Sequence, residues 1–245
     1  MMTGRNRPEL SLVFPAFDEE QNVEVLLDSA LALAPVLRQS FEVVIVDDGS
    51  RDGTAAAVEN RHRQDSRVRL VRHPANQGYG AALRTGLREA RGELVFFSDA
   101  DLQFDLAELS RLLSHTDRFD IVVGYRSPRC DPWGRRVIAF VWGRLVGVLF
   151  GLRVRDIDCA FKVFRRPVIE SMPIASIGAF VNTEILVRAR KLGYRIREVP
   201  VSHLPRRFGR QTGAHPRVIL RALVELVTLY RELRRRAPAP LRSRA

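Results

Sequence analysis

Lysine is almost absent from this chain. Of its 40 basic residues only Lys162 and Lys191 are lysine, and the formal net charge is +12 over 245 residues. A strongly positive chain favours anionic partners such as phosphates, nucleic acid or an anionic membrane surface. For arginines outside the motifs described below, the alternative to an anionic partner is a solvated surface that reflects an arginine-rich composition.

Cysteine is scarce as well. Cys130 and Cys159 are the two cysteines, too few for a disulfide framework or for a metal site built on cysteine. The chain shows no secretory signal pattern. We therefore expect a protein that works in the reducing cytoplasm.

Apolar runs long enough to span a membrane are lacking. The longest, residues 137–152, has 16 residues and contains Arg144, whereas a spanning helix needs about 20 apolar residues. Basic residues flank this run on both sides, as in a helix that lies on an anionic bilayer, although a buried core helix is an equal alternative. Residues 218–233 form a second amphipathic helical pattern, and residues 236–245 are expected to be a disordered basic tail.

Short β-rich runs alternate with helical patterns in the first half of the chain. We predict strands at residues 10–17, 41–48, 67–73, 93–101 and 120–126, and helices at 19–37 and from residues 52, 81 and 105. The runs are apolar at nearly every position, which is typical of strands covered by helices on both faces. The order predicts an α/β fold with a mostly parallel central sheet. Farther on, we expect an apolar helix, strands at 161–165 and 195–203, a helix at 182–192 and a final helix.

Carboxylates follow two of the predicted strands, and ligands of parallel sheets bind at the carboxyl ends of strands. Asp47 and Asp48 end the second strand. Helix capping explains the nearby Ser50 or Asp52, but it does not explain two adjacent carboxylates, which repel each other unless a donor-rich ligand accepts them. The pair predicts a nucleotide site.

The stretch DADLQFD follows the fourth strand and places oxygen ligands at alternate positions. It begins like a calcium EF-hand loop, but Phe104 replaces the required glycine and Ser110 the bidentate glutamate. Two carboxylates and an amide suit Mg²⁺ or Mn²⁺ that is shared with substrate phosphates. Asp105 is predicted to be the N-cap of the next helix.

Three further stretches carry possible functions. NQGYGAALRTG resembles a dinucleotide fingerprint, but its third glycine is displaced, which argues against an oxidoreductase. In FVNTEILVRAR, Asn182 or Thr183 is expected to cap a helix, and Glu184 lies in its first turn. The loop HLPRRFGRQTGAHPR is rich in arginine and suits a phosphate, with a solvated basic turn as the alternative.

Taken together, the motifs resemble those of the family-2 glycosyltransferases, in the branch of dolichol-phosphate mannose synthase and related polyprenyl-phosphate glycosyltransferases. They are FPAFDEEQNV, VVIVDDGSRDGT, NQGYGAALRTG, FFSDADLQFD, DIVVGYR, DCAFKVFRR and EVPVSH with its basic loop. The resemblance implies a Rossmann-like nucleotide-diphospho-sugar transferase (GT-A) fold. It further implies one domain over residues 1–235, in which residues 10–126 bind the nucleotide sugar and residues 127–235 face the acceptor and the membrane.

The resemblance also assigns roles to residues of this sequence. Nucleotide-sugar binding is expected of Pro15, Phe17, Glu19, Asp47, Asp48, Asp99, Ala100, Asp101, Gln103 and Arg126. Metal binding is expected of Asp99, Asp101 and Gln103. Binding of the acceptor phosphate is expected of Arg206, Arg207 and Arg210. A role in catalysis is expected of Asp99, Asp101, Arg126 and Arg206. Phe17 and Asp18 stand where the family usually has Tyr and Asn, and Thr212 where it has a lysine.

The activity implied is a metal-dependent, inverting transfer of a hexose from a nucleotide diphosphate to a polyprenyl or dolichyl phosphate. GDP-mannose is the expected donor, with transfer of mannose, and UDP-glucose is an alternative donor. A second alternative is transfer to a glycan hydroxyl, which requires a base such as Asp158 or Glu184. We expect a protein held at the inner face of the membrane, directly or by a partner protein. A nucleic-acid partner is not expected, because the paired carboxylates would repel a polyanion.

Overall fold

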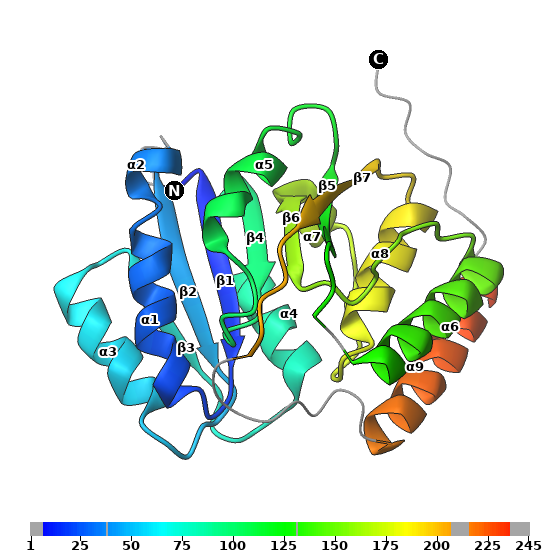
Figure 1. The fold of residues 1–245 in the computed structure, drawn as a ribbon, viewed down its shortest axis with the longest axis horizontal. Helices are drawn as coiled ribbons and strands as arrows, with labels where there is room; N and C mark the ends of the chain where they lie inside the picture. The colour runs from blue at the N-terminus through cyan, green and yellow to red at the C-terminus, as the bar shows by residue number, and fades with distance from the viewer. Residues whose placement is uncertain (1–6, 38, 131, 207–215, 236–245) are drawn as a thin grey trace.

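A computed structural model describes residues 7–37, 39–130, 132–206 and 216–235. Seven strands form one sheet in the order β3-β2-β1-β4-β6-β5-β7 (Figure 1). The strands are β1 (Leu10–Ala16), β2 (Phe41–Asp47), β3 (Val68–Arg72), β4 (Leu94–Ser98), β5 (Ile121–Arg126), β6 (Phe161–Arg165) and β7 (Ile196–Val201). All neighbouring strands are parallel except that β6 runs antiparallel to β4 and β5. The predicted, mostly parallel sheet is thus confirmed.

Helices cover both faces of this sheet. They are α1 (Glu20–Leu31), α2 (Ala34–Leu37), α3 (Thr54–Gln64), α4 (Tyr79–Glu89), α5 (Leu109–Leu113), α6 (Trp133–Phe150), α7 (Arg166–Glu170), α8 (Val181–Lys191) and α9 (Pro216–Arg235), with a 3-10 turn at Leu106–Glu108. Side chains alternate between the two faces along each strand. Leu12 and Phe14 of β1 pack in one core with α1, α3 and α5, whereas Val13 packs in a second core with α4, α6, α8 and α9. This two-sided burial explains why the strands are apolar at nearly every position.

Several predicted boundaries shift. The helix expected at residues 19–37 is interrupted and becomes α1 and α2. The N-cap expected at Asn182 or Thr183 lies two or three residues earlier, at Phe180, so neither side chain caps the helix. The cap predicted at Asp105 is confirmed, because its carboxylate accepts a hydrogen bond from the Ala107 amide. The short helix α7 was not predicted.

Helices α6 and α9 lie side by side at one end of the molecule (Figure 1). Leu226 and Leu229 of α9 share a core with Val146 and Phe150 of α6. The outer surface of the pair remains apolar: Phe140 is 69% exposed and Val224 60%. Among the helices of the described residues, none combines the length and apolarity needed to cross a membrane.

Candidate active site

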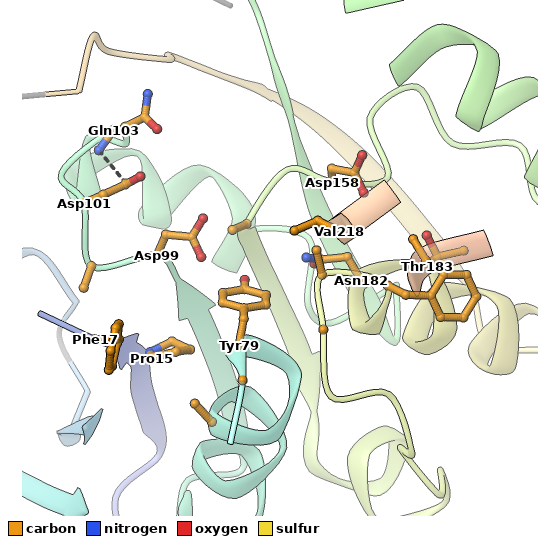
Figure 2. A pocket seen from close by; sticks show the side chains of 18 of the residues that line it. Pro15, Phe17, Tyr79, Asp99, Asp101, Gln103, Asp158, Asn182, Thr183 and Val218 are labelled. Atoms are coloured by element: carbon orange, nitrogen blue, oxygen red, sulfur yellow. Dashed lines mark hydrogen bonds between the residues drawn. The ribbon is translucent and has the colours of Figure 1, made fainter. Parts of the chain in front are cut away.

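A cavity of about 830 Å³ opens where the carboxyl ends of β1, β2 and β4 meet. Pro15, Phe17, Asp48, Asp99 and Asp101 line this end of it, and Figure 2 shows the two carboxylates of the β4 end above the Tyr79 ring. Because strands of a parallel sheet end at one edge, residues far apart in sequence meet here. The structure thus brings together most of the predicted site.

Asp99 and Asp101 repel each other. Burial and the neighbouring Asp101 carboxylate raise the pKa of Asp99 to about 7. Burial, followed by the Asp99 charge, also raises the pKa of the Tyr79 hydroxyl. Leu102, with a φ of 59°, adopts the left-handed conformation that L-residues rarely take, directly between Asp101 and Gln103. Such strain at a cluster of like charges is typical of a functional site.

The carboxylate pair fits a divalent ion. The Asp99 Oδ1 atom is buried and has no hydrogen-bond partner among the described residues, a costly state that a cation would relieve. Within the described part of the chain, no group of three or more His, Cys, Asp or Glu side chains could hold a metal on its own. A hard ion that takes its remaining ligands from substrate phosphates and water agrees with this set.

Gln103 points elsewhere. Its side-chain Nε2 donates to the Leu204 carbonyl at 3.2 Å and lies 3.3 Å from His203 Nε2. The amide therefore joins the β4–α5 loop to the segment after β7, and Figure 2 shows it directed away from Asp99. Its predicted role as a metal ligand stays a prediction, because the amide would have to rotate away from Leu204.

Arg206 approaches the same acidic group from the segment after β7. Its Nη2 atom lies 3.0 Å from Asp101 Oδ2 and 3.6 Å from Glu19 Oε1. The arginine predicted to hold the acceptor phosphate thus contacts a predicted metal ligand. Arg207 and Arg210, predicted to share its role, lie outside the described residues.

Asp48 and Asp47 each accept hydrogen bonds from this chain's own donors, although the Oδ2 atom of Asp47 is buried and accepts none from the residues that the structure describes. Asp48 accepts hydrogen bonds from the Gln77 and Gly78 amides at 2.9 and 2.8 Å, and its Oδ1 lies 2.7 Å from His73 Nδ1. Asp47 is fully buried, and its Oδ1 accepts from the Ser50 amide. Asp48 lines the cavity, whereas the buried Asp47 does not. A ligand is therefore not required to explain the pair, and its contact with base and ribose stays a prediction.

Glu19 and Arg126 each have a partner within the site. Asn22 donates to Glu19 Oε2 at 2.5 Å, while burial raises the pKa of Glu19. Arg126 forms a two-pronged ion pair with Asp156 at 2.7 and 2.8 Å. Although burial acts in the opposite direction, Arg126 holds the pKa of Asp156 below its usual range. Arg126 lines the cavity, as predicted for a phosphate-binding arginine, but its guanidinium is positioned by Asp156.

The two candidate bases differ in accessibility. Asp158 lines the cavity, and desolvation there, together with the Asp156 charge, raises its pKa. Glu184 is buried, and its carboxylate accepts from the Ala175 and Ser176 amides and from Arg188. Of these two carboxylates, Asp158 lines the cavity and Glu184 does not.

The sequence of the chain matches a known protein family. The model of the family described as glycosyl transferase family 2 matches residues 11–172. The chain belongs to this family.

Two curated relatives of this glycosyltransferase act on polyprenyl phosphates according to their names. The dodecaprenyl-phosphate galacturonate synthase of Rhizobium johnstonii is 31% identical over 84% of this chain and 63% of its own length. The undecaprenyl-phosphate 4-deoxy-4-formamido-L-arabinose transferase of Proteus mirabilis is 29% identical over 85% of this chain and 64% of its own. The chain thus spans just under two thirds of either relative.

Solved structures of glucosyl-3-phosphoglycerate synthase from Mycobacterium tuberculosis share the fold. The complex with Mn²⁺, UDP-glucose and phosphoglyceric acid has a TM-score of 0.73 at 22% identity, covering 96% of this chain and 87% of that one. The complex with Mg²⁺ and UDP has a TM-score of 0.64 at 23% identity, covering 92% and 76%. The predicted glycosyltransferase (GT-A) fold is confirmed.

The far side of the glycosyltransferase cavity is formed by residues of the half of the chain that was expected to face the acceptor, but these residues were not individually predicted. It is lined by apolar side chains of α6 and α9 and by arginines at the start of α6: Arg129, Arg135, Ile138, Ala139, Trp142, Val218, Ile219 and Ala222. Figure 2 shows Val218 of α9 beside Asn182 and Thr183 of α8. The amphipathic pattern of both helices was visible in the sequence, but it did not indicate which of their side chains would line the cavity.

Proposed function

We propose that this glycosyltransferase transfers a sugar from a nucleotide diphosphate to a polyprenyl phosphate, with inversion at the anomeric carbon and with Mg²⁺ or Mn²⁺. The observation that carries the proposal is the composition of the cavity. Carboxylates occupy the end formed by the strands, whereas arginines and apolar helix surfaces form the opposite end. A charged donor and an amphipathic lipid acceptor match these two ends.

The donor end consists of residues 10–126. Asp99 and Asp101 would hold the divalent ion, which when bound supplies Lewis-acid stabilisation of the departing diphosphate. Asp48 and the amides of the Gly78 turn form the wall beside it. Phe17 is 40% exposed at the rim and offers an aromatic face to a base.

The acceptor end consists mainly of residues 127–235. Arg129 and Arg135 lie near the apolar walls of Ile138 and Trp142, so that a lipid phosphate could pair with guanidinium while its chain lies along α6 and α9. A phosphate monoester, whose second pKa is about 6, is already ionised near neutral pH. The reaction therefore needs no strong general base.

Several sugars are candidates for the group that is transferred. GDP-mannose and UDP-glucose are the candidates from the sequence. The names of the two relatives add galacturonate and 4-deoxy-4-formamido-L-arabinose. A panel of donors must therefore cover neutral, acidic and amino-sugar derivatives.

We place the protein at the inner surface of a membrane, bound directly. The outer surfaces of α6 and α9 expose large apolar side chains, among them Trp133, Phe140, Val148, Leu220 and Val224. Arginines of both helices, such as Arg136 and Arg217, add positive charge. Apolar side chains bordered by arginine favour an anionic bilayer surface.

A second candidate is transfer to a glycan hydroxyl, and Asp158 is the observation that favours it. Its carboxylate faces the cavity with a raised pKa, as a general base would. Asp158→Asn separates the two functions, because loss of a required base lowers turnover about 10²- to 10⁴-fold. If the acceptor is a phosphate, the turnover of Asp158→Asn should fall far less, because that reaction needs no general base.

The deciding experiment incubates purified protein, Mn²⁺ and undecaprenyl phosphate with each nucleotide sugar of the panel. We expect a lipid-linked sugar from at least one donor, detected by mass spectrometry of the organic extract. The control replaces the lipid by undecaprenol, which lacks the phosphate. Transfer to an oligosaccharide hydroxyl with no lipid product from any donor would establish the second candidate instead.

A further inference from the structure

A short segment, residues 174–178, forms a wall of the cavity between α7 and α8. It packs directly against the turn that precedes α4: the Gly80 amide donates to the Ile177 carbonyl at 3.0 Å. A Cβ atom on Gly78 would lie 2.5 Å from the same carbonyl oxygen. The segment and the turn are therefore in direct contact, and the turn supplies the Gly78 amide that donates to Asp48.

Glu184 of α8 holds the 174–178 segment from behind. Its carboxylate accepts hydrogen bonds from the Ala175 amide at 3.1 Å and the Ser176 amide at 2.7 Å. The carboxylate is only 2% exposed, so that it requires a cation to offset its desolvation. Arg188, one turn along α8, supplies it through an Nε contact of 2.8 Å.

The same arginine reaches α9. Its Nη2 and Nη1 atoms lie 2.8 and 3.2 Å from the two carboxylate oxygens of Glu232. A second contact joins α9 to the segment, because Glu225 Oε1 accepts from the Ile177 amide at 3.4 Å. The wall of the donor site is therefore bonded to the helix whose opposite side is exposed and apolar.

We propose that Arg188 is a positioning residue for nucleotide binding: through Glu184 it fixes the 174–178 segment against the Gly78–Gly80 turn, and through Glu232 it ties that segment to α9. Arg188 touches no substrate. It acts by keeping the turn, and hence Asp48, in one geometry, which lowers the cost of ordering the site when the donor binds. This role rests on the proposed use of a nucleotide-sugar donor.

The test measures binding of UDP and of GDP, each with Mn²⁺, by isothermal titration calorimetry. Arg188→Met removes the charge and keeps the length of the side chain. We expect its affinity for the nucleotide that the wild type binds to fall between about tenfold and a hundredfold. With donor in excess, its turnover should recover toward that of the wild type, because the defect is in KM rather than kcat.

Arg190→Met is the matched control. Arg190 lies on the same helix, and its exposed side chain makes no hydrogen bond or ion pair with any described residue. Its variant should bind nucleotide like the wild type. Arg188→Lys, which keeps the charge but can bind only one of the two carboxylates well, should show an intermediate affinity.

Glu232→Gln tests the link to α9 separately, because it leaves the buried Arg188–Glu184 pair intact. We expect a smaller, roughly threefold loss of nucleotide affinity. If Arg188→Met fails to fold, the nucleotide affinities of Arg188→Lys and Glu232→Gln test the positioning role instead. Wild-type affinity in a folded Arg188→Met, or in both of the other variants, overturns the positioning role. A wild type that binds neither nucleotide instead refutes the proposed function, and the positioning role with it.

Discussion

The Arg206 guanidinium lies 3.0 Å from the carboxylate of Asp101 across 105 residues of sequence. This contact places a positive charge on one of the two carboxylates that we assign to the divalent ion. Arginine and ion therefore compete for Asp101, or the arginine withdraws as the ion binds.

Asp101→Asn should abolish the response to metal. Without the second carboxylate, Mn²⁺ loses both a ligand and half of the protein's negative charge at the site, and turnover should fall at least about a hundredfold. In thermal unfolding, Mn²⁺ with UDP or GDP should raise the Tm of the wild type but not of this variant. Asp105→Asn is the control, since Asp105 caps a 3-10 turn and asparagine retains that bond. An unchanged metal response in Asp101→Asn would remove the metal assignment.

Arg206→Gln should have the opposite effect on the ion alone. Removal of the competing charge should strengthen Mn²⁺ binding in the absence of nucleotide by a few-fold, since an ion pair of this partly exposed kind contributes about 1 kcal/mol. Electron paramagnetic resonance of free Mn²⁺ measures this directly. Arg72→Gln is a suitable control, because Arg72 pairs with Asp47 and neither residue lines the cavity. Weaker Mn²⁺ binding in Arg206→Gln would show that the arginine supports the ion instead of competing with it.

Gly78→Ala should weaken nucleotide binding and destabilise the fold. Gly78 has a φ of 100°, and an added Cβ would lie 2.5 Å from the Ile177 carbonyl oxygen. Strain of this kind costs about 1 to 3 kcal/mol. Gly143→Ala in α6, where an added Cβ meets nothing within 4 Å, should be neutral or stabilise by up to about 1 kcal/mol. Urea unfolding and nucleotide titration of both variants provide the comparison, and equal behaviour would contradict the packing described.

The fold and the acidic end of the site could be predicted because both depend on local sequence. The carboxylates of the site are adjacent in sequence to the strands that they follow, and Asp105 caps a turn that begins beside it. The partners of Arg126 and Arg206 could not be predicted. Asp156 lies 30 residues from Arg126, and Asp101 lies 105 from Arg206, so that only the packed sheet brings them together.

Two further features depend on tertiary structure in the same way. β6 enters the sheet antiparallel between β4 and β5, and a run of five residues carries no mark of its direction. Lys162 of this strand is buried, which the sequence did not indicate. Its ammonium donates to the Cys159 carbonyl and, at 2.7 Å, to Asn182 Oδ1.

Lys162 should make the stability of the protein depend on pH. Burial lowers the pKa of its ammonium below the ordinary range. Between the folded and unfolded pKa values the unfolded chain binds more protons, so that the free energy of unfolding rises with pH, by about 1.4 kcal/mol for each unit of lowering. Lys162→Met should lack this rise.

Lys191→Met supplies the control, because Lys191 is the other lysine of the chain and is exposed at the end of α8. Urea unfolding at about pH 8 and about pH 10 gives the comparison. Cys159, whose pKa is raised by burial to about 12, stays protonated in the folded protein at both pH values and therefore contributes equally to all three proteins. Parallel pH dependence in Lys162→Met and Lys191→Met would show that Lys162 is not a buried charge.

The outer surface of α6 and α9 should bind anionic bilayers. Phe140 and Val224 are 69% and 60% exposed, and burial of each side chain in a bilayer surface contributes about 1.5 to 3 kcal/mol. Phe140→Glu combined with Val224→Glu should therefore lower partitioning into vesicles of phosphatidylglycerol and phosphatidylcholine at least about a hundredfold. Sedimentation with sucrose-loaded vesicles measures the bound fraction. The matched control is Val25→Glu combined with Val36→Glu, which changes two exposed valines of α1 and α2 at the opposite end of the molecule (Figure 1). Equal binding of both double variants would mean that arginine charge alone holds the protein to the lipid, in which case 0.5 M salt should release the wild type completely.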